Sequence, residues 1–334
     1  MCLKDLREFW AGATPHPNPP PQGGRDPFAA PAWVAMASEQ SLVTIADGLA
    51  EAAIAPWLGA GLAWYDLTAR GKREPLFRPC RDPARAHPYE LANILLTPYS
   101  NRISGGGFAF GGAFHAVAPN VQAEPVPCHG DGFSSAWTVE KARSDSAALR
   151  LEAQGHGPWR YRARVVYALE KGALTMRLEI TNLGDKTLPF GLGLHPWLVR
   201  TPQTTLQAKA RRVVLENSIH LPAGDLPVEK RKDWNFAQAR RLPGAWINNA
   251  FLGWDGWAEV AWIDRGLTLD ITTDPPLSTY ILHSPDSEAD HFCFEPVTHP
   301  VDAFNLPGGP EANGLKVLAP GEETAISARF TPRF

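Results

Sequence analysis

Apolar and polar side chains alternate with a period of two in many short stretches of the chain after Ser41. Residues 174–180 and 267–272 carry an apolar side chain at every second position and a polar one between. In a β-strand this alternation turns one face toward a hydrophobic core and the other toward solvent. Further short runs of this kind occur at residues 52–66, 160–169, 212–215 and 258–263.

Glycine and proline separate these runs. The 334 residues include 29 glycines and 32 prolines, and clusters of them leave little room for long helices. Short strands at regular spacing, joined by turn-forming residues, favour an all-β fold built as a large antiparallel β-sandwich. No internal repeat or linker is visible after residue 41, so we expect residues 41–334 to form a single domain.

Residues 1–40 differ from the rest of the chain. Charged residues near the N-terminus interrupt any apolar stretch, so the segment is not a signal peptide. The proline-rich residues 15–24 lack the donors and the regular dihedral angles that a helix or a paired strand needs. We interpret residues 1–40 as a disordered leader, or as the product of an upstream start codon assigned in error, with the structured protein beginning near Met36.

Composition and charge exclude several classes of partner. The formal net charge is -3 and the isoelectric point is near 6.4, so no broad positive field attracts nucleic acid or an anionic membrane. No apolar run approaches the ~20 residues that cross a bilayer. Four cysteines without CxxC spacing favour reduced thiols and hence a cytoplasmic protein. Neither a heptad pattern nor an isolated apolar helix indicates the oligomeric state.

Three residues, each in a segment with its own turn formers, suggest an acid/base site. Glu295 ends a very apolar run, where desolvation would raise its pKa toward the working pH of a general base. His195 ends an apolar strand and has an ordinary pKa of ~6.5, suited to proton transfer near neutrality. His129 lies between two prolines and a glycine turn. Either histidine could instead be structural, bonded to a backbone carbonyl.

Other polar and aromatic residues could complete a cleft. Asn101 and Arg102 lie where an apolar strand runs into a glycine turn, although Arg102 could merely pair with a carboxylate at the sheet edge. Twelve tryptophans are many for one chain, and Trp197 follows His195 closely. Flat aromatic faces suit the C–H-rich faces of sugars, although most of these rings are expected in the core. The histidine and carboxylate spacings match no zinc signature.

Taken together, these motifs resemble the aldose 1-epimerases, or galactose mutarotases, in their bacterial mutarotase-like branch. The resemblance runs from about residue 41 to the C-terminus and is specific in combination rather than in any single motif. It rests on Asn-Arg-Ile before a Gly-Phe turn, His-Gly with a downstream Trp, Gly-Leu-His-Pro, Asn-Asn-Ala-Phe-Leu-Gly-Trp-Asp-Gly, Phe-Glu-Pro with a downstream Asp-Ala-Phe-Asn, and Leu-Ala-Pro-Gly-Glu, at residues 101–108, 129–137, 193–196, 248–256, 294–305 and 318–322.

The resemblance implies a galactose mutarotase-like supersandwich with a sugar cleft on one sheet and no metal or organic cofactor. By position, Glu295 would be the general base and His195 the general acid. Arg102 and His129 would hold the sugar's ring oxygen and hydroxyls. One departure is Asn248, which stands where the family commonly has an Asp that binds substrate hydroxyls; Asp255 could supply a carboxylate instead, but Trp-Asp-Gly favours a tight turn.

The sequence leaves three functions open. The first is interconversion of the α and β anomers of a free aldohexose. The second is 1-epimerisation of a hexose 6-phosphate, for which Arg70, Lys72, Arg73 and Arg78 could form a basic pocket, or simply a solvated loop. The third is sugar binding without catalysis. Residue types alone do not rank individual sugars.

Overall fold

The computed structural model describes residues 40–69, 71–122, 124–273 and 277–334. Ser41–Phe334 form one compact unit. The leader expected over residues 1–40 lies, except for Gln40, outside the described residues. No helix within the described ranges combines the length and the apolar character that crossing a membrane requires.

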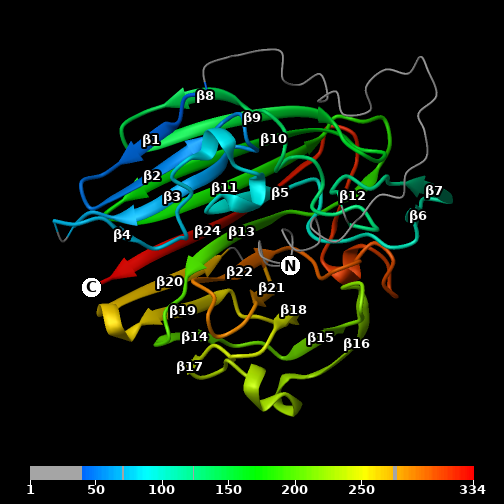
Figure 1. Ribbon diagram of the computed structural model, residues 1–334. Helices are drawn as coiled ribbons and strands as arrows, with labels where there is room; N and C mark the ends of the chain where they lie inside the picture. Colours follow the sequence, from blue (N-terminus) through cyan, green and yellow to red (C-terminus); the bar gives the residue numbers. More distant parts are fainter. Residues whose placement is uncertain (1–39, 70, 123, 274–276) are drawn as a thin grey trace, which may run out of the picture. The chain divides into compact units, whose positions relative to one another are not determined.

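Two large antiparallel sheets make up most of this unit (Figure 1). The first sheet has eleven strands among the described residues. In spatial order they are β1 (Val43–Ala46), β2 (Ala50–Ala55), β3 (Gly61–Leu67), β5 (Asn93–Leu96), β13 (Gly193–Val199), β22 (His291–Val297), β21 (Thr279–Ser284), β18 (Ile247–Leu252), β15 (Arg212–Glu216) and β16 (Pro222–Pro227), with β4 (Glu74–Pro75) paired to β3.

The second sheet has nine strands in the part of the chain that is described. In spatial order they are β17 (Arg240–Arg241), β14 (Thr204–Ala208), β19 (Trp257–Trp262), β20 (Leu267–Thr273), β24 (Glu323–Arg333), β11 (Ala173–Asn182), β10 (Arg160–Glu170), β9 (Ser146–Gln154) and β8 (Thr138–Ala142).

Short elements complete the described chain. Two small ribbons pair β12 (Leu188–Phe190) with β23 (Lys316–Leu318), and β6 (Gly107–Phe110) with β7 (Ala113–Ala116). The helices of the described ranges are single 3-10 turns, as the density of glycine and proline predicts. They are η2 (Pro83–Arg85), η3 (Pro88–Glu90), η4 (Val228–Lys230), η5 (Lys232–Trp234), η6 (Ile263–Arg265) and η7 (Glu311–Asn313).

The period-two stretches fold as the sequence predicts, with one correction. Residues 174–180 lie in β11 and residues 267–272 in β20, each with its apolar positions buried. The run at 52–66, however, is two strands, β2 and β3, joined by a tight turn. Gly59 in that turn has φ +66°, and a Cβ there would lie 2.0 Å from the carbonyl oxygen of Phe133, so the backbone reverses where no side chain fits.

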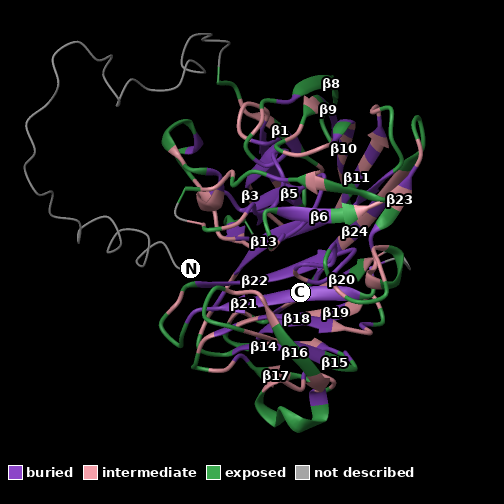
Figure 2. Ribbon diagram, turned by 90° about the vertical axis from the view of Figure 1, so that its right-hand side faces the viewer, coloured by how far each residue is buried: buried purple, intermediate pink, exposed green. Residues whose placement is uncertain are grey.

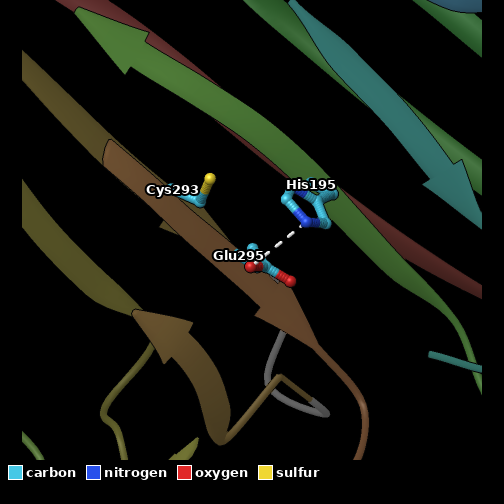
Figure 3. A group of neighbouring side chains, drawn as sticks. All are labelled: His195, Cys293 and Glu295. Carbon is cyan, nitrogen blue, oxygen red and sulfur yellow. Dashed lines mark ion pairs between the residues drawn. The ribbon is translucent and has the colours of Figure 1, made fainter. Parts of the chain in front are cut away.

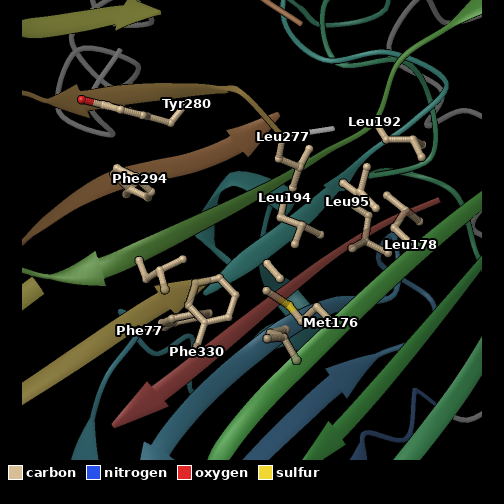
Figure 4. Packing of buried hydrophobic residues seen from close by; sticks show 14 of the residues in the cluster. Phe77, Leu95, Met176, Leu178, Leu192, Leu194, Leu277, Tyr280, Phe294 and Phe330 are labelled. Atoms are coloured by element: carbon tan, nitrogen blue, oxygen red, sulfur yellow. The ribbon is translucent and has the colours of Figure 1, made fainter. Parts of the chain in front are cut away.

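The apolar faces of the two sheets meet in one core, which confirms the all-β sandwich (Figure 4). Leu95, Leu194 and Phe294 enter it from the first sheet, and Met176 and Phe330 from the second. All five side chains are fully buried. Burying a side chain of this size stabilises the fold by about 1.5–3 kcal/mol, so the core holds the central strands in fixed register.

The opposite face of the first sheet, here called the site face, is covered only in part. Figure 2 shows β21 and β22 buried along their whole length, whereas β8 at the edge of the second sheet is exposed. Because paired residues of neighbouring strands share a face, the ladder registers define what the site face carries. One row of it runs through Ile94, His195, Glu295, Ile281 and Ala250, on β5, β13, β22, β21 and β18.

Candidate active site

His195 and Glu295 are direct neighbours on the site face. The register of β13 with β22 pairs Gly193 with Val297 and Trp197 with Cys293, which places His195 opposite Glu295. The His195 Nε2 atom lies 3.3 Å from Oε1 of Glu295, and the two side chains point toward each other (Figure 3). The pairing of β13 with β22 therefore brings an imidazole and a carboxylate together although they lie far apart in the sequence.

Burial sets the electrostatics of this pair. Glu295 is 2% exposed and His195 is 8% exposed. Removal from water raises the pKa of Glu295 well above its ordinary value, against the opposing effect of the Arg102 charge. Burial lowers the pKa of His195 well below its ordinary value, helped by His129 and His283. Both shifts favour a pair that holds a single proton, on Glu295, beside a neutral His195.

His129 reaches the same place from a loop. Its ring lies 5.6 Å from that of His195, centroid to centroid. The Asn120 side chain holds this loop: its Oδ1 accepts from the Cys128 N–H at 2.8 Å, and its Nδ2 donates to the Cys128 carbonyl at 2.8 Å. Burial lowers the pKa of His129 to about 3, with a smaller effect from Arg102. The imidazole is therefore neutral at all physiological pH values.

Arg102 is fixed by a carboxylate that the sequence analysis did not name. Its Nε and Nη2 donate to the two oxygens of Glu124 at 2.9 and 2.7 Å, a bidentate pair. Its Nη1 also donates to Oδ1 of Asn101 at 3.3 Å. The guanidinium is paired with a carboxylate, although from a loop and not from a sheet edge, and it also lines a hollow on the site face together with Asn101.

Trp197 supports His195 from behind. The two rings stack at 4.0 Å with an interplanar angle of 21°, and the Arg78 guanidinium lies 5.2 Å from the Trp197 ring centroid. Since Trp197 is only 6% exposed, little of its face is left for a ligand. Trp137 and Trp254 lie in the core, as expected for most tryptophans. Asp255 is a turn residue, whose Oδ1 accepts from the Trp257 N–H at 3.3 Å.

A second row of the site face carries groups that the sequence analysis missed. It runs through Trp197, Cys293, His283 and Asn248, on β13, β22, β21 and β18. Beyond Asn248 lies Glu216 at the end of β15, bonded to Asn248 Nδ2 at 3.0 Å. Period-two counting could have found His283, because it stands two positions from Ile281, directly after the apolar run of residues 280–282 in β21.

The hollow on the site face adjoins the His195–Glu295 pair. It is shallow: it encloses about 10 Å³, enough for one water molecule, and about 280 Å³ when the open space at its mouth is included. Ile281 and Ala250 form its floor, in the same row as Glu295. Polar side chains surround that floor; they are those of Asn101, Arg102, Glu216, His220, Asn248 and Asn249.

One group of donors could also hold a metal ion. His195, Cys293 and Glu295 each offer a ligand atom, and the three atoms lie within 4.8 Å of one another. Imidazole, thiol and carboxylate are ligands that zinc accepts. The direct contact between His195 and Glu295, however, is also the arrangement that proton transfer needs.

The basic residues considered for a phosphate are already engaged. Lys72 pairs with Glu74 at 2.7 Å, and Arg73 pairs with Glu51 at 2.7 Å and with Asp66 at 3.0 Å. Arg78 donates to the Tyr89 carbonyl at 2.7 Å, beneath Trp197. Arg70 lies outside the described residues. Among the described residues, these charges do not gather into a pocket for a dianion.

Comparison with known proteins assigns the family. The family model for aldose 1-epimerase matches residues 41–331. The chain belongs to the aldose 1-epimerase family. As a family member it is an isomerase that acts on carbohydrates, and the expected resemblance is confirmed.

Relatives of this aldose 1-epimerase family member agree along most of its length. The uncharacterized protein YphB of Escherichia coli K12 is 34% identical over 78% of this chain and 88% of its own. A candidate aldose 1-epimerase of Escherichia coli K12 has a crystal structure with a TM-score of 0.80 at 30% identity, covering 88% of this chain and 99% of that one. A galactose mutarotase-like protein of Clostridium acetobutylicum shares the fold alone, with a TM-score of 0.77 at 16% identity, over 89% and 96% of the two chains.

Proposed function

We propose that the protein is a mutarotase, which interconverts the α and β anomers of a free aldohexose by acid/base ring opening. The observation that carries this proposal is the 3.3 Å contact between His195 Nε2 and Glu295 Oε1 on the site face. The hydroxyl oxygen and the ring oxygen of a hemiacetal are bonded to the same carbon. Two proton-transfer groups in contact with each other can therefore reach both oxygens from one side of the sugar.

In the proposed mechanism, Glu295 takes the proton from the anomeric hydroxyl while His195 gives a proton to the ring oxygen. The C1–O bond to the ring oxygen breaks, and its electron pair stays on that oxygen as the hydroxyl forms. The aldehyde rotates about C1–C2, and closure on the other face reverses both proton transfers. The reaction needs the single proton of the pair on His195. The raised pKa of Glu295 and the lowered pKa of His195 place that proton on Glu295 in the empty protein, so it must first pass to His195 across the 3.3 Å contact.

The neighbouring residues would position the sugar. The neutral His129 imidazole and the Arg102 guanidinium would donate to sugar oxygens, and Asn101 would orient Arg102 through its amide oxygen. Asn248 would contact a distal hydroxyl from the hollow, and Trp197 would keep the His195 ring in place. Each well-placed acid or base is typically worth about 10² to 10⁴ in rate.

The two alternative functions have weaker support. A hexose 6-phosphate would need an unpaired cationic pocket, whereas Lys72 and Arg73 are paired with carboxylates. A non-catalytic sugar-binding protein would have no use for a buried carboxylate in contact with a buried imidazole, because burying ionisable groups costs stability. We also propose a cytoplasmic location, on the composition of the chain.

The test is anomer exchange of D-glucose and D-galactose, measured by NMR exchange spectroscopy or polarimetry. We expect the wild type to accelerate exchange and Glu295→Gln to lose about 10² to 10⁴ of that acceleration. Glu229→Gln, the same chemical change at an exposed site on η4, is the matched control and should leave the rate unchanged. Full activity of Glu295→Gln would exclude Glu295 as the base, and sugar binding without acceleration by the wild type would favour the non-catalytic alternative.

A further inference from the structure

The side chain of Asn248 is oriented by Glu216. Asn248 Nδ2 donates to Glu216 Oε2 at 3.0 Å, from β18 to the neighbouring β15. A carboxylate only accepts, so the atom of the Asn248 amide that faces it is the NH₂ group. The amide oxygen of Asn248 is thereby turned away from Glu216, and it accepts no hydrogen bond from any described residue. It belongs to a side chain that lines the hollow beside Glu295.

Glu216 is itself held by two further donors. Trp246 Nε1 donates to its Oε1 at 2.9 Å, and His220 Nδ1 lies 2.7 Å from its Oε2. His220 has φ +61°, a left-handed conformation that residues other than glycine rarely adopt, and the Asn217 side chain closes its turn by accepting from the Leu221 N–H at 3.1 Å. The loop after β15 thus directs the His220 ring back onto Glu216. Three donors from three different places fix one carboxylate.

We propose that Glu216 is a positioning residue that commits the Asn248 amide to accept a hydroxyl hydrogen from an uncharged aldose. This inference rests on the proposed function, because it assumes that the sugar lies over the mouth of the hollow, within reach of Asn248. Where the family resemblance leads one to expect a carboxylate, this chain presents a neutral carbonyl oxygen. The carboxylate is displaced by one strand, to Glu216.

The same arrangement selects against anionic sugars. The cations that line the hollow are Arg102 and, when protonated, His220, and each is paired with a carboxylate, Glu124 or Glu216. A sugar phosphate or uronate placed here would meet the Glu216 charge with no unpaired cation among the described lining residues. These pairings disfavour an anionic sugar over the hollow.

Two substitutions separate this role from a merely structural one. In Glu216→Gln, an amide that keeps its oxygen toward Trp246 turns an NH₂ group toward Asn248, so the Asn248 amide must reverse and offer the sugar a donor. In Asn248→Asp, two carboxylates face each other. The double variant Glu216→Gln/Asn248→Asp restores a donor facing an acceptor and again presents an acceptor oxygen to the sugar.

The experiment measures dissociation constants for D-glucose, D-galactose and D-glucose 6-phosphate by calorimetry, and kcat and KM for anomer exchange on the same samples. We expect the wild type to bind the neutral hexoses at least about tenfold more tightly than the 6-phosphate. Each single variant should weaken hexose binding about tenfold, and the double variant should recover to within about threefold of the wild type. The loss should lie in KM, with kcat within about twofold, while Glu229→Gln binds like the wild type.

Three results would overturn the inference: hexose binding by Glu216→Gln that equals the wild type, a double variant at least as weak as either single variant, or a wild type that prefers the 6-phosphate. Thermal unfolding of every variant shows whether it is folded, and if Glu216→Gln does not fold, Asn248→Asp and its recovery in the double variant decide. The expected binding pattern without any anomer exchange would refute the proposed function and leave the assignment of Glu216 standing. Normal anomer exchange by the wild type, with both single variants binding hexose as tightly as the wild type, would support the proposed function and refute the assignment of Glu216.

Discussion

The backbone N–H of Asn101 donates to Nδ1 of His129 at 3.0 Å, and the backbone N–H of His129 donates to the Asn101 carbonyl at 2.9 Å. Both residues have left-handed backbone conformations, with φ +60° and +63°. Because Nδ1 accepts, the neutral imidazole of His129 carries its hydrogen on Nε2. Two strained loops thereby fix one tautomer, and His129 is prepared to donate a hydrogen bond rather than to exchange a proton.

Because His129 is buried in its neutral form, we expect the fold to lose stability in acid. The pKa of His129 is lowered to about 3 and that of His299 to about 4, both first by burial, whereas an unfolded histidine titrates near 6.5. The stability that each neutral histidine contributes is complete above pH 6.5 and is lost as the pH falls toward these values. We expect the free energy of unfolding to fall by up to about 1.4 kcal/mol per pH unit for each histidine.

Urea unfolding between pH 8 and 5 measures this slope, and His129→Gln is the comparison. The glutamine oxygen can accept from the Asn101 N–H but does not titrate, so the slope of this variant should be shallower. In the wild type, the NMR signals of the His129 ring should not shift between pH 8 and 5. A ring that titrates near 6.5 would contradict the assignment of His129 as a neutral donor.

Glu295 predicts the opposite dependence on pH. Its folded pKa is raised by burial, so the unfolded chain releases this proton first, near pH 4.5, and the fold loses stability as the pH rises from there toward the folded pKa. Glu295→Gln resembles the protonated form and does not ionise. We therefore expect its stability to equal that of the wild type near pH 4 and to exceed it increasingly at higher pH, by up to about 1.4 kcal/mol per unit.

Denaturation of the wild type and of Glu295→Gln at a series of pH values tests this expectation. Glu229→Gln again serves as the control, since its side chain is exposed. A Glu295→Gln protein that is less stable than the wild type at neutral pH would mean that the carboxylate is ionised and satisfied in the fold. A Glu295→Gln protein that is more stable but less active than the wild type is the result expected when a buried ionisable group serves catalysis at the expense of stability.

Arg102 predicts a loss of affinity that depends on geometry rather than on charge. A lysine at this position keeps the positive charge but cannot donate to both oxygens of Glu124 at once. We expect Arg102→Lys to raise KM for anomer exchange by about tenfold, through the loss of one or two hydrogen bonds, with a smaller change in kcat. Arg212→Lys is a matched control, because Arg212 makes a comparable bidentate pair with Asp225, from β15 to the edge strand β16, at an exposed position. Equal effects of the two substitutions would argue against a role of Arg102 in binding.

The sequence predicts the strands of this fold better than its loops. Alternation in β11 and β20 is a local signal, and their buried faces follow it directly. Glu295 and His195 could be identified because a carboxylate and an imidazole stood out in apolar runs. Both lie inside their strands, β22 and β13, and not at the strand ends that the sequence suggested. Their contact could not, because it depends on the register of β13 against β22, which pairing across the whole sheet decides.

The remaining site residues lie where local signals are weak. Glu124 pairs with Arg102 from a loop, and the bridge between Arg102 and Cys128, with the hydrogen bonds around it, brings the two loops together. Glu216 and His220 surround a turn whose left-handed residue is a histidine, so no glycine marks it. His283 carried a usable signal, since it directly follows the apolar run of β21 in the phase of the site face. Turn geometry and cross-strand register, rather than residue types, contain the missing information.

The group formed by His195, Cys293 and Glu295 predicts inhibition by zinc. Their ligand atoms lie within 4.8 Å of one another, close to the spacing at which one ion could bind all three. An ion there would occupy the carboxylate and the imidazole that the proposed mechanism uses to move protons.

We expect added Zn²⁺ to inhibit anomer exchange, and a chelator such as EDTA to restore full activity but not to raise the activity of untreated protein. Cys293→Ser should weaken the inhibition about tenfold while it keeps most of the activity, because a hydroxyl is a poorer ligand for zinc than a thiolate. Loss of activity on treatment with the chelator alone would instead mean that the protein works through a metal ion, and the proton-transfer mechanism would have to be abandoned.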